Sequence, residues 1–219
     1  MTTVDDDTLQ RLVLDELRWQ SSVNSAKIGV IAKQGVVTLT GHVDSYAEKV
    51  AAERAASGVN GVKAIAQEIE VILPSEHRRT DEDIAMAALK VLEWDASVPH
   101  EHLHVQVEKG WITLRGDVDR QHQRAAAEHD VHKLVGVIGV TNAIKVRRSA
   151  TPQDIGDRIE AALRRDASLE ASGIRVVVEG GKIILIGKVP SWYERERAER
   201  AAWAAPGVSE VENRIAVEW

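Results

Sequence analysis

Several residue types are scarce or missing in this chain of 219 residues, and each absence excludes something. There is no cysteine, which rules out disulfides, thiolate metal sites and thiol redox chemistry. There is no phenylalanine and only 4% of residues are aromatic, so the cores must be built mainly from aliphatic side chains. No run approaches the ~18 apolar residues of a membrane-spanning helix.

A surplus of positive charge is also missing. The formal net charge is −6, which gives no support for a nucleic-acid partner, because that role needs a concentrated basic surface. The opening residues, MTTVDDDTLQRLVLDELRW, lack the basic segment and apolar run of a secretory signal. The chain as written is therefore predicted to be cytoplasmic, and periplasmic if an upstream signal is missing.

What the chain does contain is a repeat. The segment KQGVVTLTGHV (33–43) returns as EKGWITLRGDV (108–118) and again as GGKIILIGKV (180–189). Three series of glycines keep the same intervals of 75 and then 71 residues: Gly35, Gly110 and Gly181; Gly41, Gly116 and Gly187; Gly61, Gly136 and Gly207. The chain is three copies of one unit.

Each copy has the same order of predicted elements, seen most clearly in the first. Residues 5–19 begin with acidic side chains and continue with helical spacing of apolar ones. Residues 27–43 alternate apolar and polar side chains around a central glycine, which predicts a β-hairpin. An alanine-rich helix at 45–61 and a strand at 64–73 follow, so the order is αββαβ.

This order predicts an α+β fold of three tandem αββαβ units. The helix between the last two strands is a crossover, so the third strand should run parallel to the second, while the first two are antiparallel. Each unit should be a small mixed sheet with two helices on one face. The units are predicted at 4–73, 79–148 and 151–219, joined near 74–80 and 147–152.

The nine repeated glycines are predicted to be structural. Gly41 shares the inward parity of Val37, Leu39 and Val43, so its missing side chain is expected to let a helix backbone approach or to permit a β-bulge. Gly35 lies in the hairpin link, where a positive φ is expected.

The pattern resembles the BON domain, named for bacterial osmotically induced and nodulation proteins. The resemblance rests on the αββαβ order, on VTLTG, ITLRG and IILIG ending at Gly41, Gly116 and Gly187, and on the GV pairs at Gly61, Gly136 and Gly207. It covers nearly the whole chain. It implies a non-enzymatic protein associated with phospholipid membranes, cell-envelope integrity and osmotic stress.

The residues themselves show no catalytic set. The polar positions shared by all copies are Glu53, Glu128 and Glu199, interpreted as a solvated helix face, and Gln67, Asn142 and Asn213, expected to bond a backbone group. We therefore predict no enzyme activity and no cofactor. The leading hypothesis is association with anionic phospholipid or an envelope partner in osmotic stress, and the alternative is a cytosolic interaction scaffold that binds no lipid.

Histidine is the one unequal element, because six of eight lie in the second copy. His100, His102 and His104 alternate, so they would share one face of a strand that extended through them. Adjacent neutral imidazoles can bind zinc, nickel or copper. The alternative is that the three histidines are exposed polar side chains on a solvated face and bind no metal.

The second helix of the third copy is the predicted membrane contact. Trp192 and Tyr193 would lie in its first turn after the candidate N-cap Ser191, with Arg195 following. Aromatic rings at headgroup depth and guanidinium groups near lipid phosphates are typical of an interfacial anchor. The alternative is that the aromatics cap the core and the charged residues pair along a solvated face.

A second predicted interaction surface is the open sheet face of the third copy. This face should present four apolar side chains, which would form a patch of the kind that soluble proteins cover: Val177, Ile184, Ile186 and Ala216. We expect it to pack on another unit or on a second molecule. The alternative is a modest patch exposed to solvent.

Overall fold

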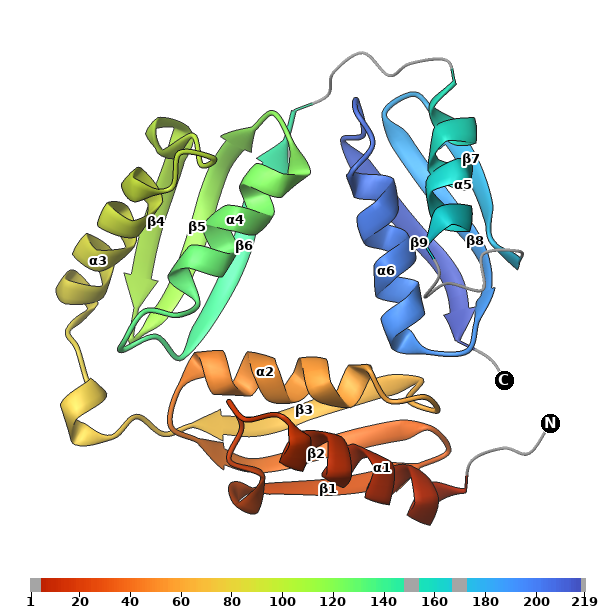
Figure 1. The fold of residues 1–219 in the computed structure, drawn as a ribbon. Helices are drawn as coiled ribbons and strands as arrows, with labels where there is room; N and C mark the ends of the chain where they lie inside the picture. The colour runs from red at the N-terminus through yellow and green to blue at the C-terminus, as the bar shows by residue number, and fades with distance from the viewer. Residues whose placement is uncertain (1–4, 148–153, 167–172, 218–219) are drawn as a thin grey trace. The chain divides into compact units, whose positions relative to one another are not determined.

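The computed structural model describes residues 5–147, 154–166 and 173–217, and these form three αββαβ units (Figure 1). The first contains α1 (Asp6–Trp19), β1 (Ile28–Lys33), β2 (Val36–Val43), α2 (Tyr46–Ser57) and β3 (Ala64–Val71). The second contains α3 (Asp81–Trp94), β4 (Leu103–Glu108), β5 (Trp111–Val118), α4 (Gln121–Val131) and β6 (Gly139–Val146). The third contains α5 (Ile155–Arg165), β7 (Arg175–Glu179), β8 (Lys182–Val189), α6 (Trp192–Trp203) and β9 (Glu210–Val217).

The helices begin where short polar side chains can satisfy their free N–H groups. The Asp5 carboxylate accepts a hydrogen bond from the Thr8 amide, and Thr80 and Asp83 form a reciprocal capping box at the start of α3. Hydrogen bonds from the Thr8 and Thr80 hydroxyl groups, together with those from the backbone amides of the same residues, favour the charged carboxylates and lower the pKa of Asp5 and Asp83. Ser191 caps α6, as predicted, by accepting from the Glu194 amide.

Each sheet has three strands in the order of the chain, and the predicted directions are confirmed. The first two strands of every unit are antiparallel. β5 runs parallel to β6, and β8 to β9. In the first unit the Lys63 amide bonds the Gly35 carbonyl and the Ile72 amide bonds the Val43 carbonyl, one at each end of β2 and β3, so these strands also run in the same direction.

The core of each unit lies between its sheet and its two helices, which cover one face only (Figure 1). In β5 the alternating side chains of Ile112, Leu114 and Val118 are buried, and they pack with Ile84 and Leu92 of α3. The same positions recur in the third unit, where Ile183, Leu185 and Val189 pack with Ile159 and Leu163. The α+β fold of three mixed sheets is therefore confirmed, and the opposite face of each sheet carries no helix of its own unit.

The segments between units are only partly described. Residues 75–77 form a single 3-10 turn within the first predicted join, and most of the second join lies outside the described residues. The unit boundaries at 4–73, 79–148 and 151–219 stay predictions. Among the described residues, no helix is both long enough and apolar enough to span a bilayer.

Candidate functional site

The repeated glycine of the second strand lies against a carbonyl group, not against a helix. A Cβ built on Gly41 would stand 2.1 Å from the carbonyl oxygen of Lys27, the residue just before β1. Gly116 and Gly187 meet the carbonyls of His102 and Gly173 in the same way, at 2.1 and 2.2 Å. The expected close contact is present, but it is made with the backbone at the start of the first strand and not with a helix. The alternation of side chains shows which face of the sheet a residue occupies, but not which atom lies against it.

The other repeated glycines lie at turns. Gly35 and Gly110 have φ of 83° and 80° in the hairpin links, and Gly61, Gly136 and Gly207 have φ of 104°, 96° and 85° before the last strand. Gly181 packs against Ser209 and the Gly207 carbonyl. All nine positions therefore belong to the framework of the fold.

A carboxylate supports the hairpin in the first two units. Gln34 and Lys109 precede the turn glycines and have φ of 53° and 49°, a conformation that costs L-residues free energy. The Asp6 carboxylate accepts from the Gln34 amide at 2.7 Å, and Asp81 accepts from the amides of Lys109 and Gly110 at 2.7 and 2.8 Å.

The hairpin turn of the third unit has a different sequence. Its sequence has Pro152 where the others have aspartate, outside the described residues, and Gly180 where they have Gln34 and Lys109. Gly180 takes φ of 61° without a Cβ penalty. A glycine at the turn thus accompanies the loss of the supporting carboxylate.

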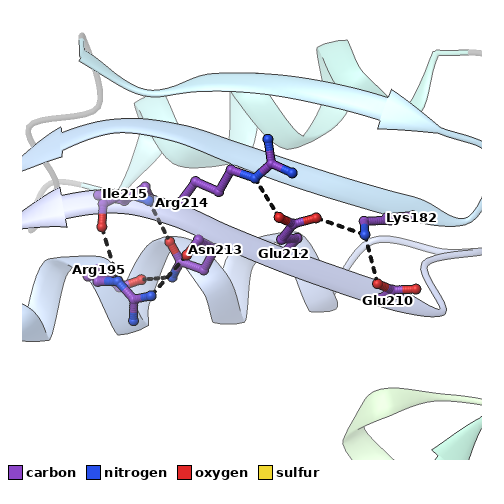
Figure 2. Close-up of polar contacts among 7 residues, drawn as sticks. All are labelled: Lys182, Arg195, Glu210, Glu212, Asn213, Arg214 and Ile215. Carbon is purple, nitrogen blue, oxygen red and sulfur yellow. Dashed lines mark hydrogen bonds and ion pairs between the residues drawn. The ribbon is translucent and has the colours of Figure 1, made fainter.

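A polar contact ties the second helix of each unit to its last strand. The Asn213 side-chain amide donates to the Arg195 carbonyl at 3.1 Å and to the Glu199 carboxylate at 3.0 Å, and its oxygen accepts from the Ile215 amide. Figure 2 shows Asn213 between α6 and β9. Asn142 makes the equivalent bonds to the Arg124 carbonyl, Glu128 and the Ile144 amide.

Gln67 makes two of these bonds in the first unit: it donates to Glu53 at 3.4 Å and accepts from the Ile69 amide at 3.1 Å. The predicted backbone role of the three amides is confirmed. Glu53 and Glu128 are exposed, as the interpretation of a solvated helix face predicts, and Glu199 is half-buried. Each also accepts a hydrogen bond from the amide, which the sequence did not predict.

The predicted membrane contact on α6 has its arginines engaged within the unit. Arg195 donates to the backbone carbonyls of Asn213 and Ile215 on β9 (Figure 2). Its guanidinium lies 4.7 Å from the centre of the Trp192 ring. Arg197 forms an ion pair with Asp166 and lies over the Tyr193 ring. Trp192 is half-buried, so the aromatic and cationic groups of α6 are largely paired with each other.

The open sheet face of the third unit is crossed by charged side chains. Lys182 bonds Glu210 at 3.0 Å and Glu212 at 2.7 Å, and Glu212 also bonds Arg214 (Figure 2). Hydrogen bonds from Arg214 and Lys182 lower the pKa of Glu212 to about 2.

The four predicted interface residues lie between these charges. Ile184 pairs with Val177 on one side and with Glu212 on the other, and only 6% of it is exposed. Val177, Ile186 and Ala216 are half-buried. The face is therefore less apolar than its sequence pattern indicated, because long charged side chains lie along the same strands.

The three alternating histidines do not share a strand face. His100 and His102 lie in a 3-10 turn, and β4 begins after them at Leu103, so only His104 is in the strand. The proline at position 99 precedes this turn. In the described part of the chain, no group of three or more histidine and acidic side chains is arranged to hold a metal ion.

Two carboxyl groups lie close together at the ends of α3 and α4. Hydrogen bonds from the side chain and amide of Ser97 lower the pKa of Asp95. Burial raises the pKa of Asp130, and repulsion from Asp95 raises it further. The Oδ2 atom of Asp130 is buried without a hydrogen-bond partner.

The raised pKa of Asp130 predicts a pH effect. The folded second unit binds a proton at Asp130 more readily than the unfolded chain does, so this residue favours folding increasingly as pH falls through the raised pKa. Asp130→Asn should therefore be more stable than the natural protein at about pH 7, and this advantage should shrink as the pH falls to about 4, the ordinary pKa of aspartate. Chemical denaturation at both pH values checks it, with the exposed Asp119→Asn as control. An equal difference at both would contradict the prediction.

The most exposed apolar surface of the second unit is on α3. Ile84, Ala88 and Leu92 face the core, and the opposite stripe of the helix carries Met86, Leu89 and Trp94, which are 57, 56 and 78% exposed. Lys90 and Glu93 lie between them on the same stripe. We refer to these five residues as the α3 stripe. A shallow hollow of about 680 Å³ is lined by the same residues.

The α3 stripe was missed from the sequence apart from the position of Trp94. The equivalent residues of the first unit are Arg11, Leu14, Asp15, Arg18 and Trp19, and those of the third are Asp157, Glu160, Ala161, Arg164 and Arg165. Only the second copy gathers a methionine, a leucine and a tryptophan on its outer helix face. A comparison of the three copies along this helix face could have revealed the α3 stripe from the sequence.

Comparison with known proteins identifies the family. The BON domain matches residues 5–72, 80–148 and 152–218. Osmotically-inducible protein Y of Escherichia coli is 30% identical over 152 residues, covering 66% of this chain and 74% of its own. The 21 kDa hemolysin of Actinobacillus pleuropneumoniae is 35% identical over 79 residues, covering 34% of this chain and 41% of its own.

Among solved structures, CdsD, a structural protein of the type III secretion system of Chlamydia trachomatis, aligns over 95% of this chain and 91% of its own. Its identity is 13% and its TM-score 0.27, too low to carry an argument. The family rests on the three sequence matches, which fall on the three αββαβ units seen in the structure. The chain belongs to the BON domain family, with three tandem copies of the domain.

Proposed function

We propose that this protein is a non-catalytic binding protein that attaches to phospholipid surfaces in the response to osmotic stress, through the α3 stripe. The name of the Escherichia coli relative, osmotically-inducible protein Y, supports the osmotic setting. The observation that carries the proposal is the exposure of Met86, Leu89 and Trp94 on one side of a single helix. A helix that turns such side chains to solvent is suited to lie in the membrane interface.

The chemistry of the stripe favours insertion over charge attraction. Trp94 can place its ring at headgroup depth, and the Lys90 stem can extend its ammonium group toward lipid phosphates. Glu93 and the three acidic residues in the first turn of α3 oppose a purely electrostatic attraction. Binding should therefore depend mainly on apolar contact and change little between low and physiological salt.

The experiment is co-sedimentation with vesicles of phosphatidylethanolamine and phosphatidylglycerol at physiological salt. Trp94→Ala should weaken binding about tenfold, since losing a partly buried aromatic costs about 1.4 kcal/mol or more. Trp19→Ala is the matched control, because Trp19 ends α1 and is 84% exposed but has the charged Arg11 in place of Met86, with Leu14 in place of Leu89. Equal loss in both variants, or none in either, would reject the α3 stripe.

Trp192→Ala tests the membrane contact predicted from sequence. We expect this variant to bind vesicles normally and to melt earlier than the natural protein, because its ring packs under the Arg195 guanidinium. Weaker vesicle binding without loss of stability would instead assign the contact to α6.

One observation favours the alternative of an interaction protein without lipid. In an antiparallel pair of α3 helices centred between Val91 and Leu92, Lys90 would lie opposite Glu93 of the other copy, and Leu89 opposite Trp94. The stripe is therefore complementary to itself. Sedimentation velocity without lipid separates the two functions, because a dimer that Trp94→Ala dissociates would support self-association and contradict membrane attachment.

A further inference from the structure

The open sheet face of the second unit holds an immobilised tryptophan. Trp111 begins β5 immediately after the hairpin turn and is 46% exposed. Its register partner on β6 is Gly139, and a Cβ built there would stand 2.3 Å from two carbons of the indole ring. The ring therefore rests on the bare backbone of Gly139.

A hydrogen bond fixes the orientation of the ring as well. The indole Nε1–H donates to the Thr141 hydroxyl at 2.9 Å, two residues further along β6 on the same face. One part of the indole is thus held by packing and another by a directed bond. A side chain that is already ordered loses little further entropy when a ligand stacks on it.

The three residues of this arrangement occur together in the second unit only. At the equivalent positions the first unit has Val36, Ala64 and Ala66, and the third has Lys182, Glu210 and Glu212, which form the ion pairs of Figure 2. The tryptophan, the glycine beneath it and the threonine beside it are therefore a local specialisation.

Around the ring the face is polar and balanced in charge. A shallow depression of about 310 Å³ is lined by Gln106, Glu108, Lys109, Trp111, Thr113 and Ile138. Gln106 accepts a bond from Arg115 on the next strand. The lining thus offers amide, hydroxyl, carboxylate and ammonium groups beside one flat apolar ring, with one acidic and one basic side chain.

We propose that this face binds a neutral oligosaccharide by stacking a sugar ring on Trp111. A pyranose has a flat face of C–H groups and a rim of hydroxyls, which matches an exposed aromatic ring bordered by donors and acceptors. A polyanion would meet Glu108 as well as Lys109, and a lipophilic molecule would need a deeper apolar pocket than this open face provides. The face lies opposite α3, so the inference is independent of the membrane proposal.

The experiment follows the Trp111 indole N–H signal by nuclear magnetic resonance during titration of the full chain with chitotetraose, cellotetraose or maltotetraose. At least one sugar should shift this signal in a saturable way, with a Kd of about 1 mM. Trp111→Ala should weaken binding at least about tenfold. Gly139→Ala, which displaces the ring without removing it, should also weaken binding. Trp94→Ala is the control and should bind normally.

Thr141→Val keeps the proposal testable if the other variants unfold. It removes the hydroxyl that accepts from the Trp111 indole while preserving the size of the side chain. This variant should bind the sugar several-fold more weakly. The proposal is overturned if none of the three sugars shifts the indole signal, or if Trp111→Ala binds as well as the natural chain. A shift that depends on protein concentration in the absence of sugar would assign the face to self-association instead.

Discussion

Gly41→Ala is expected to remove a large fraction of the stability of the first unit. The substitution requires an alanine at φ of 109° and places its Cβ 2.1 Å from the Lys27 carbonyl oxygen. Backbone strain and overpacking together should cost about 3 kcal/mol or more. A unit of this size has a total stability of only roughly 4 to 10 kcal/mol, so the loss is a large fraction of it.

Amide hydrogen exchange on the whole chain measures this effect, with the second and third units as internal references. Protection should fall in β1, β2 and β3 and stay unchanged elsewhere. Gly58→Ala is the matched control in the same unit, because its Cβ would meet no atom closer than 3.4 Å and its φ is ordinary. Retained protection in Gly41→Ala would show that the Lys27 carbonyl can move aside at little cost.

The second large effect concerns the carboxylate under the hairpin. Asp81→Ala removes two charge-assisted hydrogen bonds to the amides of Lys109 and Gly110, and should destabilise the second unit by about 2 kcal/mol. Adding Lys109→Gly should restore about 1 kcal/mol, because glycine accepts the positive φ without penalty. The double variant then matches the third unit, which has Gly180 and no aspartate at these positions.

Urea denaturation monitored by exchange of second-unit peptides distinguishes the single and double variants. The exposed neighbour Glu82→Ala serves as control for loss of a negative charge near the start of α3. Lys109→Gly should raise the free energy of unfolding by the same amount in the natural protein and in the Asp81→Ala variant. Unequal amounts would show that the Asp81 hydrogen bonds and the backbone conformation of residue 109 are energetically coupled. No effect of Asp81→Ala would mean that the turn supports its own conformation.

The framework was predictable because it depends on local patterns. Alternation in 27–43 gave the hairpin, the alanine-rich segment gave the crossover helix, and the crossover required the parallel pair. The repeat strengthened each of these predictions, because the same assignment had to suit three different sequences. The Asn142 and Asn213 contacts were also predictable, since an amide of inward parity needs a partner.

The surfaces were much harder to predict. The arginines of α6 were expected to lie near lipid phosphates or to pair with neighbours along the helix, yet Arg195 reaches β9 and Arg197 reaches Asp166, partners 18 to 31 residues away. Met86 and Leu89 of α3 were not singled out, because a helix with many apolar residues does not reveal which ones lack a neighbour. Local patterns identify which face a residue occupies, but long side chains choose their partners through tertiary structure.

The asparagine ties also govern how a unit opens. The Asn142 side-chain NH2 group donates to a carbonyl and to a carboxylate of α4, so α4 cannot lift from β6 without breaking both bonds together. Its oxygen accepts from the Ile144 amide of the same strand, which holds the side chain in place. The second helix and last strand should therefore behave as a single foldon. In the first unit the longer Gln67 meets its glutamate at 3.4 Å instead of 3.0 Å, which weakens this coupling. Three units with one architecture would then open with unequal free energies, and the first would be the most readily recognised by a protease or chaperone.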